Sequence, residues 1–433
     1  MTAELKRPYS SSDRRIPRTI IQPAQRFAAI ETAGGIVMLA GAVVALVWAN
    51  SPWSSSYQDL FDTVISFRVG DVIDLDLTVH EWINDGLMSL FFLVVGLEIK
   101  RQLVHGELRD RRAAALPALA ALGGMIVPAA IYILLNLGGA TDGFGVPVAT
   151  DIAFAVGVVT LVGSRVPLGV RIFILTLAVV DDIGGIIVIA IFYAEGVSFA
   201  WLAVGAACLA GAWVARRLEI RSLVPYVALG VVCWYSLHQA GVEAAIVGVA
   251  FGLMTPAEPF HDPSRLGDGV ADFVHHFERS DDTVPSQIVE YVREVASPLD
   301  RIEDRLATWV SFVIVPIFAI ANAGVKVSIE GLDTNVFAGV LFGLVVGKLV
   351  GVVAFTWLAV RLGIGRLPER TTWAHVVGIG TTAGIGFTVA LFVAGLSFDD
   401  ADLLRSAKLG IICASAVAGV LGYAVLRRAS RDA

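Results

Sequence analysis

The sequence predicts an all-α polytopic membrane protein with about 12 transmembrane helices. Hydrophobic residues make up 56% of its 433 positions and charged residues only 16%, against roughly 25% in ordinary soluble domains. Long apolar runs recur along nearly the whole chain. This composition excludes a disordered chain and leaves too little polar surface for a large soluble enzyme. The net charge of −7 gives no sign of nucleic-acid binding.

The individual spans follow from the lengths of the apolar runs. A hydrocarbon core of ~30 Å needs about 20 apolar residues in a helix. Twelve runs reach or approach this length, and the shorter ones are interpreted as spanning or re-entrant helices because of their neighbours. The predicted spans are 27–49, 80–104, 113–136, 147–163, 168–193, 198–215, 222–237, 242–255, 306–325, 334–360, 373–397 and 402–426.

Basic residues alternate from one loop to the next. The N-terminal tail, 1–26, carries six Lys or Arg residues, whereas loop 50–79 carries only Arg68 and five aspartates. Since basic loops stay in the cytoplasm, the alternation predicts that both termini are cytoplasmic. The chain is then a single membrane domain over 27–426, with one long cytoplasmic loop at 256–305 and a short C-terminal tail at 427–433.

Several charged residues fall inside predicted spans, where a charge costs at least ~3 kcal/mol and usually faces a functional cavity. Those near span ends are explained equally well by an interfacial or packing role: Glu31, Asp85, Glu98, Arg171, Arg405 and Lys408. The others inside predicted spans are Asp151, Asp181, Asp182, Glu243 and Lys348.

Asp181 and Asp182 lie near the middle of the run LTLAVVDDIGGIIVIAIFY. Burial and mutual repulsion both favour the neutral form of neighbouring carboxyl groups, so this pair suits reversible binding of protons. Carboxylate oxygens are also the ligands that hard cations prefer. Lys348, the one base deep in a span, needs a buried carboxylate partner, and Asp181 or Asp182 is the candidate. A purely structural pair with the lysine is the alternative.

Two spans contain signals for an interruption. The short run around Thr150 and Asp151 follows Gly143, Gly145 and Pro147, and the run 378–396 holds four glycines within nine residues. Asp151 is either a simple helix cap or a charge that neutralises two facing helix ends. The two runs occupy matching places in spans three to five and ten to twelve, which enter from opposite sides. This is the pattern of an inverted-repeat transporter, although close helix packing through glycine would also explain the second run.

These stretches resemble the NhaA-type sodium/proton antiporters. The resemblance runs in order from about residue 20 to 426 and rests on ATDIAFAVG (149–157), LAVVDDIGGIIVIAIFY (177–193), ANAGV (321–325) and VVGKLVG (345–351), with further agreement at FFLVVGLEIKRQL (91–103) and AGIGFT (383–388).

The resemblance implies an electrogenic antiporter in the bacterial cytoplasmic membrane. It would exchange cytoplasmic Na⁺ or Li⁺ for external protons, without a cofactor, and support intracellular pH and sodium homeostasis. Asp181 and Asp182 would bind the ion or the protons in turn, with Thr150 beside the site and Lys348 paired to Asp181. Asp151 and Lys348 would offset the dipoles of two crossed, discontinuous helices.

The chain departs from the family pattern where a pH response is expected. Glu98 and Glu303 match family positions of this kind, and Glu243 replaces a histidine, so these three are candidates for a pH response. However, Gln102 takes the place of the next acidic residue, and Asp304 and Ala307 replace histidines. A homodimer is expected by analogy, since some members dimerise through a small hairpin at the places of residues 137–146 and 50–79.

Two other classes remain as alternatives. An intramembrane aspartyl protease uses two carboxyl groups that face one another, but adjacent residues on one helix diverge by about 100°. Asp151 could supply the second group. A sodium-coupled symporter of the same architecture is the other, and the buried Lys348 argues against it because it favours competition with protons.

Overall fold

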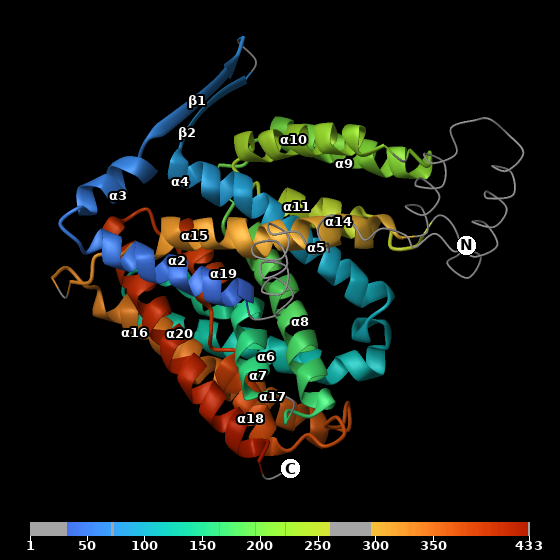
Figure 1. Ribbon diagram of the computed structural model, residues 1–433, viewed down its shortest axis with the longest axis vertical. Helices are drawn as coiled ribbons and strands as arrows, with labels where there is room; N and C mark the ends of the chain where they lie inside the picture. Colours follow the sequence, from blue (N-terminus) through green and yellow to red (C-terminus); the bar gives the residue numbers. More distant parts are fainter. Residues whose placement is uncertain are drawn as a thin grey trace, which may run out of the picture.

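The computed structural model describes residues 33–70, 73–163, 165–194, 196–220, 222–259, 296–328 and 330–431 (Figure 1). It is a bundle of long helices with one small β-hairpin. The helices are α2 (Ala33–Ala49), α3 (Ser54–Phe61), α4 (Val79–Glu81), α5 (Met88–Val104), α6 (Arg111–Leu135), α7 (Ile152–Val162), α8 (Leu168–Phe192), α9 (Phe199–Arg217), α10 (Leu223–Gln239), α11 (Ile246–Met254), α14 (Pro298–Trp309), α15 (Val315–Ala323), α16 (Thr334–Phe342), α17 (Lys348–Arg361), α18 (Trp373–Thr382), α19 (Phe387–Ser397) and α20 (Ala401–Ala429).

Five shorter helical segments join or extend these helices. Three have π geometry, which often marks functional positions within α-helices. They are η3 (Trp82–Leu87), η7 (Val310–Ile314) and η8 (Gly343–Gly347), and the two 3₁₀ segments are η4 (Glu107–Arg109) and η5 (Thr141–Val148).

The polytopic class is confirmed, but the number of spans is not. In the described residues, eight helical runs are long and apolar enough to cross a membrane, or up to ten if each of two bent pairs is one span. Each of the twelve predicted ranges overlaps a helix, yet α10 has only 17 residues and α11 only 9. The count of twelve and the side of the termini therefore stay predictions. The predicted tail 1–26 lies outside the described residues, and α14 begins at Pro298, within the range predicted for the long loop.

A β-hairpin of β1 (Val64–Val69) and β2 (Ile73–Thr78) projects from one end of the bundle, a departure from a purely helical fold (Figure 1). Its strands are antiparallel, with Ser66 opposite Asp76. Hydrogen bonds from Ser66 and from Arg68 lower the pKa of the Asp76 carboxyl group, and Arg68 lies 2.7 Å from it. This end of the molecule is called the hairpin end below.

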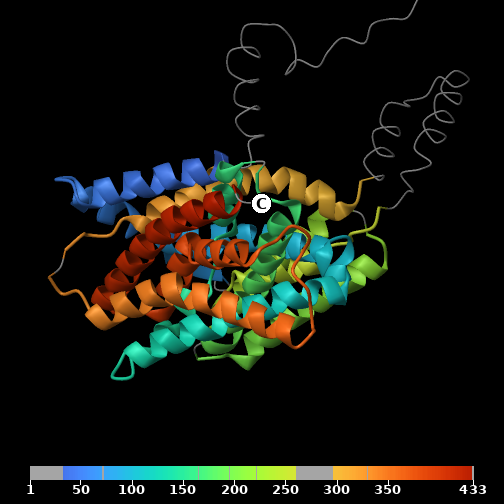
Figure 2. The same cartoon turned by 90° about the horizontal axis from the view of Figure 1, so that it is seen from below.

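The bundle is built from close helix pairs, and small residues make the closest contacts possible. Helix α6 packs on α17, α5 on α11, and α2 on α15, the last pair running side by side in both ribbon views (Figures 1 and 2). A Cβ added to Gly351 of α17 would lie 2.1 Å from the carbonyl oxygen of Gly123 in α6. This contact fixes α17 against α6 at the level of Lys348, one turn earlier.

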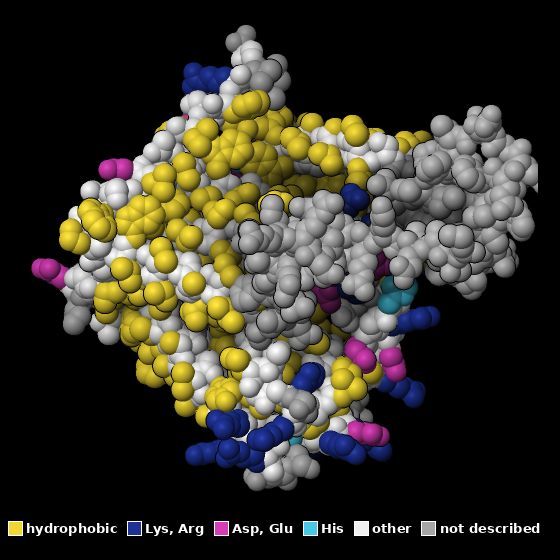
Figure 3. Space-filling model, viewed as in Figure 1, with side chains coloured by type: hydrophobic (Ala, Val, Ile, Leu, Met, Phe, Trp, Pro, Cys, Tyr) yellow, Lys and Arg dark blue, Asp and Glu magenta, His cyan; other side chains and the backbone are white. Residues whose placement is uncertain are grey.

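The outer surface is largely apolar, as expected for contact with lipid (Figure 3). Large aliphatic side chains are exposed on α2, for example Val43, Val44 and Val47, and on α10, for example Val224 and Val227. Lys and Arg side chains gather instead at the end of the bundle near the C-terminus, at the bottom of the view. We call this the basic end.

Candidate ion-binding site

Two interrupted helical segments meet in the interior of the bundle. The first leaves η5 at Val148 and enters α7 at Ile152, and the second leaves α18 at Thr382 and enters α19 at Phe387 with a bend of 47°. Two hydrogen bonds tie the connecting residues together. The Asp151 amide donates to the carbonyl oxygen of Ile385 at 2.7 Å, and the Thr150 hydroxyl donates to that of Ala383 at 2.9 Å.

Glycine makes this close approach of two backbones possible. A Cβ on Gly384 would lie 2.5 Å from the Leu344 carbonyl oxygen, and one on Gly386 would lie 3.2 Å from that of Ala149. The glycine-rich run therefore ends α18 and allows the backbone to pass tightly beside η8 and η5. A larger residue at position 384 would push these segments apart.

Asp151 lies between the N-terminal ends of α7 and α19. Its Oδ1 accepts from the Phe154 amide of α7 at 3.2 Å, and its Oδ2 accepts from the Thr388 amide of α19 at 3.1 Å and from the Thr388 hydroxyl. Helix N-termini carry partial positive charge and unpaired amides, so one carboxylate satisfies both ends. Asp151 is 3% exposed, which makes this arrangement an internal one.

Lys348 lies beside the C-terminal end of η5. Its ammonium group donates to the Val148 carbonyl oxygen and to Asp181 Oδ2, the latter at 2.6 Å. Both side chains are buried, with Lys348 0% and Asp181 1% exposed. Of the two aspartates that the sequence left as candidate partners, the structure pairs the lysine with Asp181.

Asp181 Oδ2 is engaged by Lys348, so Asp181 Oδ1 and the carboxyl group of Asp182 are the acidic oxygens available to a ligand. Asp181 Oδ1 is buried and has no hydrogen-bond partner among the described residues. Asp182 is half-buried and close enough to Asp181, Asp151 and Lys348 to interact with their charges. In the part of the chain that the structure describes, no three His, Cys, Asp or Glu residues form a metal cluster. An ion here would take carboxylate oxygens together with hydroxyl or carbonyl oxygens.

The three residues predicted for a pH response do not form one group. Glu98 and Glu303 meet where α5 packs on α14, and there Gln102 donates to Glu98 at 2.9 Å and Arg101 lies 2.8 Å from Glu303. Glu243 lies at the start of α11, near Asp85. Thirteen residues of helix separate Asp85 from Glu98, which corresponds to ~20 Å.

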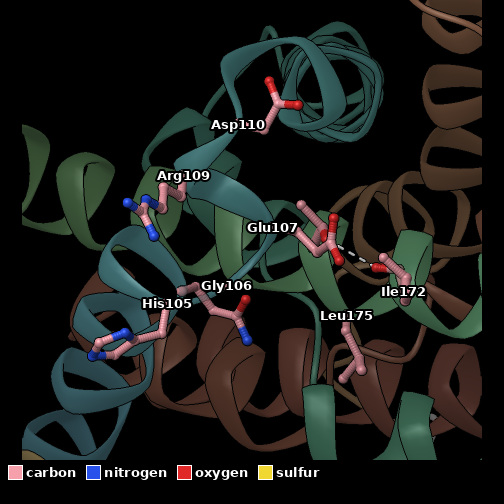
Figure 4. Close-up of a pocket in the computed structure, with 9 residues that line it drawn as sticks. His105, Gly106, Glu107, Arg109, Asp110, Ile172 and Leu175 are labelled. Atoms are coloured by element: carbon pink, nitrogen blue, oxygen red, sulfur yellow. Dashed lines mark hydrogen bonds between the residues drawn. The ribbon is translucent and has the colours of Figure 1, made fainter.

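A cavity of about 700 Å³ opens near the first group (Figure 4). Gln102, Glu107 and Asp110 give it a polar wall, and Ile172, Leu175 and Thr176 of α8 form the opposite side. Thr176 precedes Asp181 by five residues, ~7.5 Å along the helix. The cavity thus reaches α8 within two turns of the aspartate pair.

Sequence reasoning missed several polar partners that complete the interior. Thr388 belongs to the motif AGIGFT, but nothing in the sequence indicates that its hydroxyl group donates to Asp151. Lys408, which the sequence places near a membrane interface, is 9% exposed. Asn322 bridges His80 and Asn84 with hydrogen bonds of 3.1 and 2.9 Å. Glu31 lies outside the described residues.

Interrupted helices whose ends meet buried charges within a polytopic bundle define the class of secondary ion transporters. The model of the Na⁺/H⁺ antiporter 1 family matches residues 25–426, and the chain belongs to this family. It is 42% identical to the Na⁺/H⁺ antiporter NhaA of Rhodopirellula baltica, over 94% of each chain. It is 44% identical to NhaA of an Anaeromyxobacter species, over 95% of this chain and 92% of the relative.

A solved structure shows that the fold extends to distant antiporters. The sodium proton antiporter MjNhaP1 of Methanocaldococcus jannaschii matches with a TM-score of 0.52, covering 95% of this chain and 98% of the other. The two sequences are only 11% identical, so this likeness concerns the fold alone.

Proposed function

We propose that this protein is a Na⁺/H⁺ antiporter, a secondary transporter rather than an enzyme, and that it exports Na⁺ or Li⁺ in exchange for protons. Family membership over residues 25–426 and the curated relatives support the exchange of Na⁺ for H⁺. The observation that carries the mechanism is the buried Asp181–Lys348 ion pair beside Asp182, within two turns of a cavity. Such a site can bind either a cation or protons, because both neutralise the same carboxylate charge and a bound cation disfavours protonation.

In this mechanism Asp182 is the central ligand, and Asp181 contributes its free Oδ1 atom. Thr150 lies beside them: its hydroxyl group is close enough to interact with the Asp181 carboxyl group, and it also donates to the Ala383 carbonyl oxygen at 2.9 Å. When protons occupy the carboxyl groups, the site has no charge to attract Na⁺. When Na⁺ binds, its positive charge drives the protons off. One site therefore couples the two fluxes.

Asp151 and Lys348 have a second role, which is to stabilise the interrupted helices. Asp151 accepts hydrogen bonds from the N-terminal ends of α7 and α19, and Lys348 donates to the C-terminal end of η5. These contacts hold the ends of both interruptions near the ion pair while leaving Asp182 available. The protease alternative is disfavoured, because both oxygens of Asp151 accept hydrogen bonds from these helix ends.

The direction of transport depends on the orientation that the loop charges predict. With the basic end in the cytoplasm, the 700 Å³ cavity is the cytoplasmic access route. Glu98 accepts a hydrogen bond from Gln102, which lines this cavity, and it remains with Glu303 a candidate for a pH response. More protons enter than Na⁺ ions leave, so the membrane potential helps to drive export from the bacterial cell. The protein then supports pH and sodium homeostasis in the cytoplasmic membrane, where a homodimer joined through the hairpin is expected.

The test is sodium-evoked loss of a pH gradient in inside-out vesicles. The wild type should collapse the gradient on addition of Na⁺ or Li⁺, and Asp182→Asn should not. Asp399→Asn serves as the matched control, since it makes the same change at an exposed position away from the site. Normal sodium-dependent proton flux in Asp182→Asn would refute the assignment of the site.

A further inference from the structure

Outside the ion-binding site, the hairpin end of α5 and α11 holds a second group of titratable side chains. A narrow apolar gap lies there between four helices, and it is too tight to admit a water molecule. Its lining is aromatic and aliphatic except for a single carboxyl group, that of Glu243. The apolar lining consists of Phe92, Ile186, Ile189, Ala245, Ile246, Val249 and Phe392.

The gap lies beside α8, in the turns that follow Asp181 and Asp182. Ile186 and Ile189 follow Asp182 by four and seven residues, which places them ~6 and ~10 Å further along the helix. The 700 Å³ cavity lies on the other side of the pair, before Asp181. The apolar gap therefore separates the pair from the hairpin end, whereas the wide cavity approaches it from the basic end.

On the side away from the apolar gap, Glu243 lies near a pair of titratable side chains, His238 and Asp85. His238 Nδ1 lies 3.3 Å from Asp85 Oδ2, and both side chains are partly exposed, at 28% and 21%. Both interact electrostatically with Glu243. Glu81 is the other charged group that acts on His238.

The pair is held in place by an aromatic stack. The rings of Trp82 and Trp234 stack at 5.8 Å, and Trp234 stacks in turn on His238 at 5.8 Å. Trp234 also donates to the Asp85 carbonyl oxygen at 3.1 Å, and Asp85 belongs to the π segment η3. A fixed, partly exposed His–Asp pair beside a half-buried carboxyl group is an arrangement suited to passing protons.

We propose that Glu243 is a proton-relay residue that carries protons between the His238–Asp85 pair and Asp182 across the apolar gap. This inference rests on the proposed antiport and adds the route by which protons reach the site from the hairpin end. A proton moves from the water beside His238 to the Glu243 carboxylate, and from Glu243 to the Asp182 carboxylate when the gap opens. Sodium binds at the aspartate pair and does not need Glu243 to titrate.

The experiment compares two modes of exchange in proteoliposomes, Na⁺/H⁺ exchange and exchange of isotopic Na⁺ for Na⁺. The variant Glu243→Gln keeps the shape of the side chain but cannot carry a proton. We expect it to lose at least tenfold in Na⁺/H⁺ exchange and to retain Na⁺/Na⁺ exchange within about twofold. Glu243→Asp, which still titrates, should recover most of the Na⁺/H⁺ exchange. Glu330→Gln is the matched control at an exposed loop position.

The two modes separate a relay from a structural role. Equal loss of both modes in Glu243→Gln would mean that the residue only supports the fold, and unchanged rates in both would mean that protons bypass it. Either result overturns the relay while leaving the antiport intact. Failure of the wild type to exchange Na⁺ for H⁺ would instead refute the proposed function itself.

Discussion

Replacing Lys348 with alanine should destabilise the protein through a charge that loses its partner. In the native structure the Lys348 ammonium group contacts Asp181 at 2.6 Å, and neither side chain reaches solvent. Breaking a buried ion pair from one side typically costs ~3–5 kcal/mol. The variant can limit this cost by protonating Asp181. Protonating a carboxyl group of ordinary pKa near 3.9 at pH 7 costs about 4 kcal/mol, at 1.36 kcal/mol per pH unit.

Two consequences can be measured by thermal unfolding in detergent. For a chain of 433 residues, a loss of about 4 kcal/mol corresponds to a fall in Tm on the order of 4–8 °C. The loss should shrink as the pH falls from 7 toward 4, because the proton that neutralises Asp181 then costs less. Lys326→Ala, at an exposed loop position, is the control.

The double variant Lys348→Ala with Asp181→Asn decides whether charge is the cause. It has no buried charge without a partner, so it should regain most of the stability that the single variant loses. If the double variant melts as early as Lys348→Ala, the loss comes from the cavity alone, and the argument from the ion pair is wrong.

Five further variants test the ion site and the packing around it. Asp181→Asn and Asp182→Asn should each abolish exchange in vesicles while the protein still inserts, because an amide keeps the shape but cannot titrate. Thr388→Val should lower stability by about 1.5–3 kcal/mol, since it removes a hydrogen bond to buried Asp151, and an unchanged Tm would contradict this role. Gly248→Ala should prevent normal packing of α11 on α5, because its Cβ would lie 2.0 Å from the Ser89 carbonyl oxygen, and a normal Tm would count against that contact. Introducing histidine at Asp304 and Ala307, near Glu303, should shift or steepen the pH profile of exchange, and an unchanged profile would remove these positions as its cause.

Much of the site could be predicted from the sequence because charge inside an apolar run is costly and therefore informative. Asp181, Asp182, Asp151 and Lys348 stood out for this reason, and the glycines of 378–386 indicated an interruption. The structure adds which groups touch. Residue types and spacing alone do not decide between Asp181 and Asp182 as the partner of Lys348, because both lie on one helix within reach of a flexible side chain. Only the family resemblance indicates Asp181, and the structure places the lysine there.

The structure differs from the sequence-based expectations at positions whose burial or neighbours depend on helix packing. Lys408 looks interfacial because it is only seven residues into α20, yet the neighbouring helices bury it. Glu243 was grouped with Glu98 and Glu303 as a candidate for a pH response, but the length of α5 separates them. Sequence distance carries no signal for such placements, because they arise from contacts between helices far apart in the chain.

The central claim is that Na⁺ and protons compete for one site at Asp181 and Asp182. The measurement that tests it most directly is the half-saturation constant for Na⁺ in inside-out vesicles at several pH values, with the pH gradient and the potential controlled. Below the apparent pKa of the pair, the constant should fall ~10-fold per pH unit for each competing proton, and above it the constant should level off. A constant that does not change with pH across the active range would mean that Na⁺ and protons use separate sites, which would contradict the mechanism.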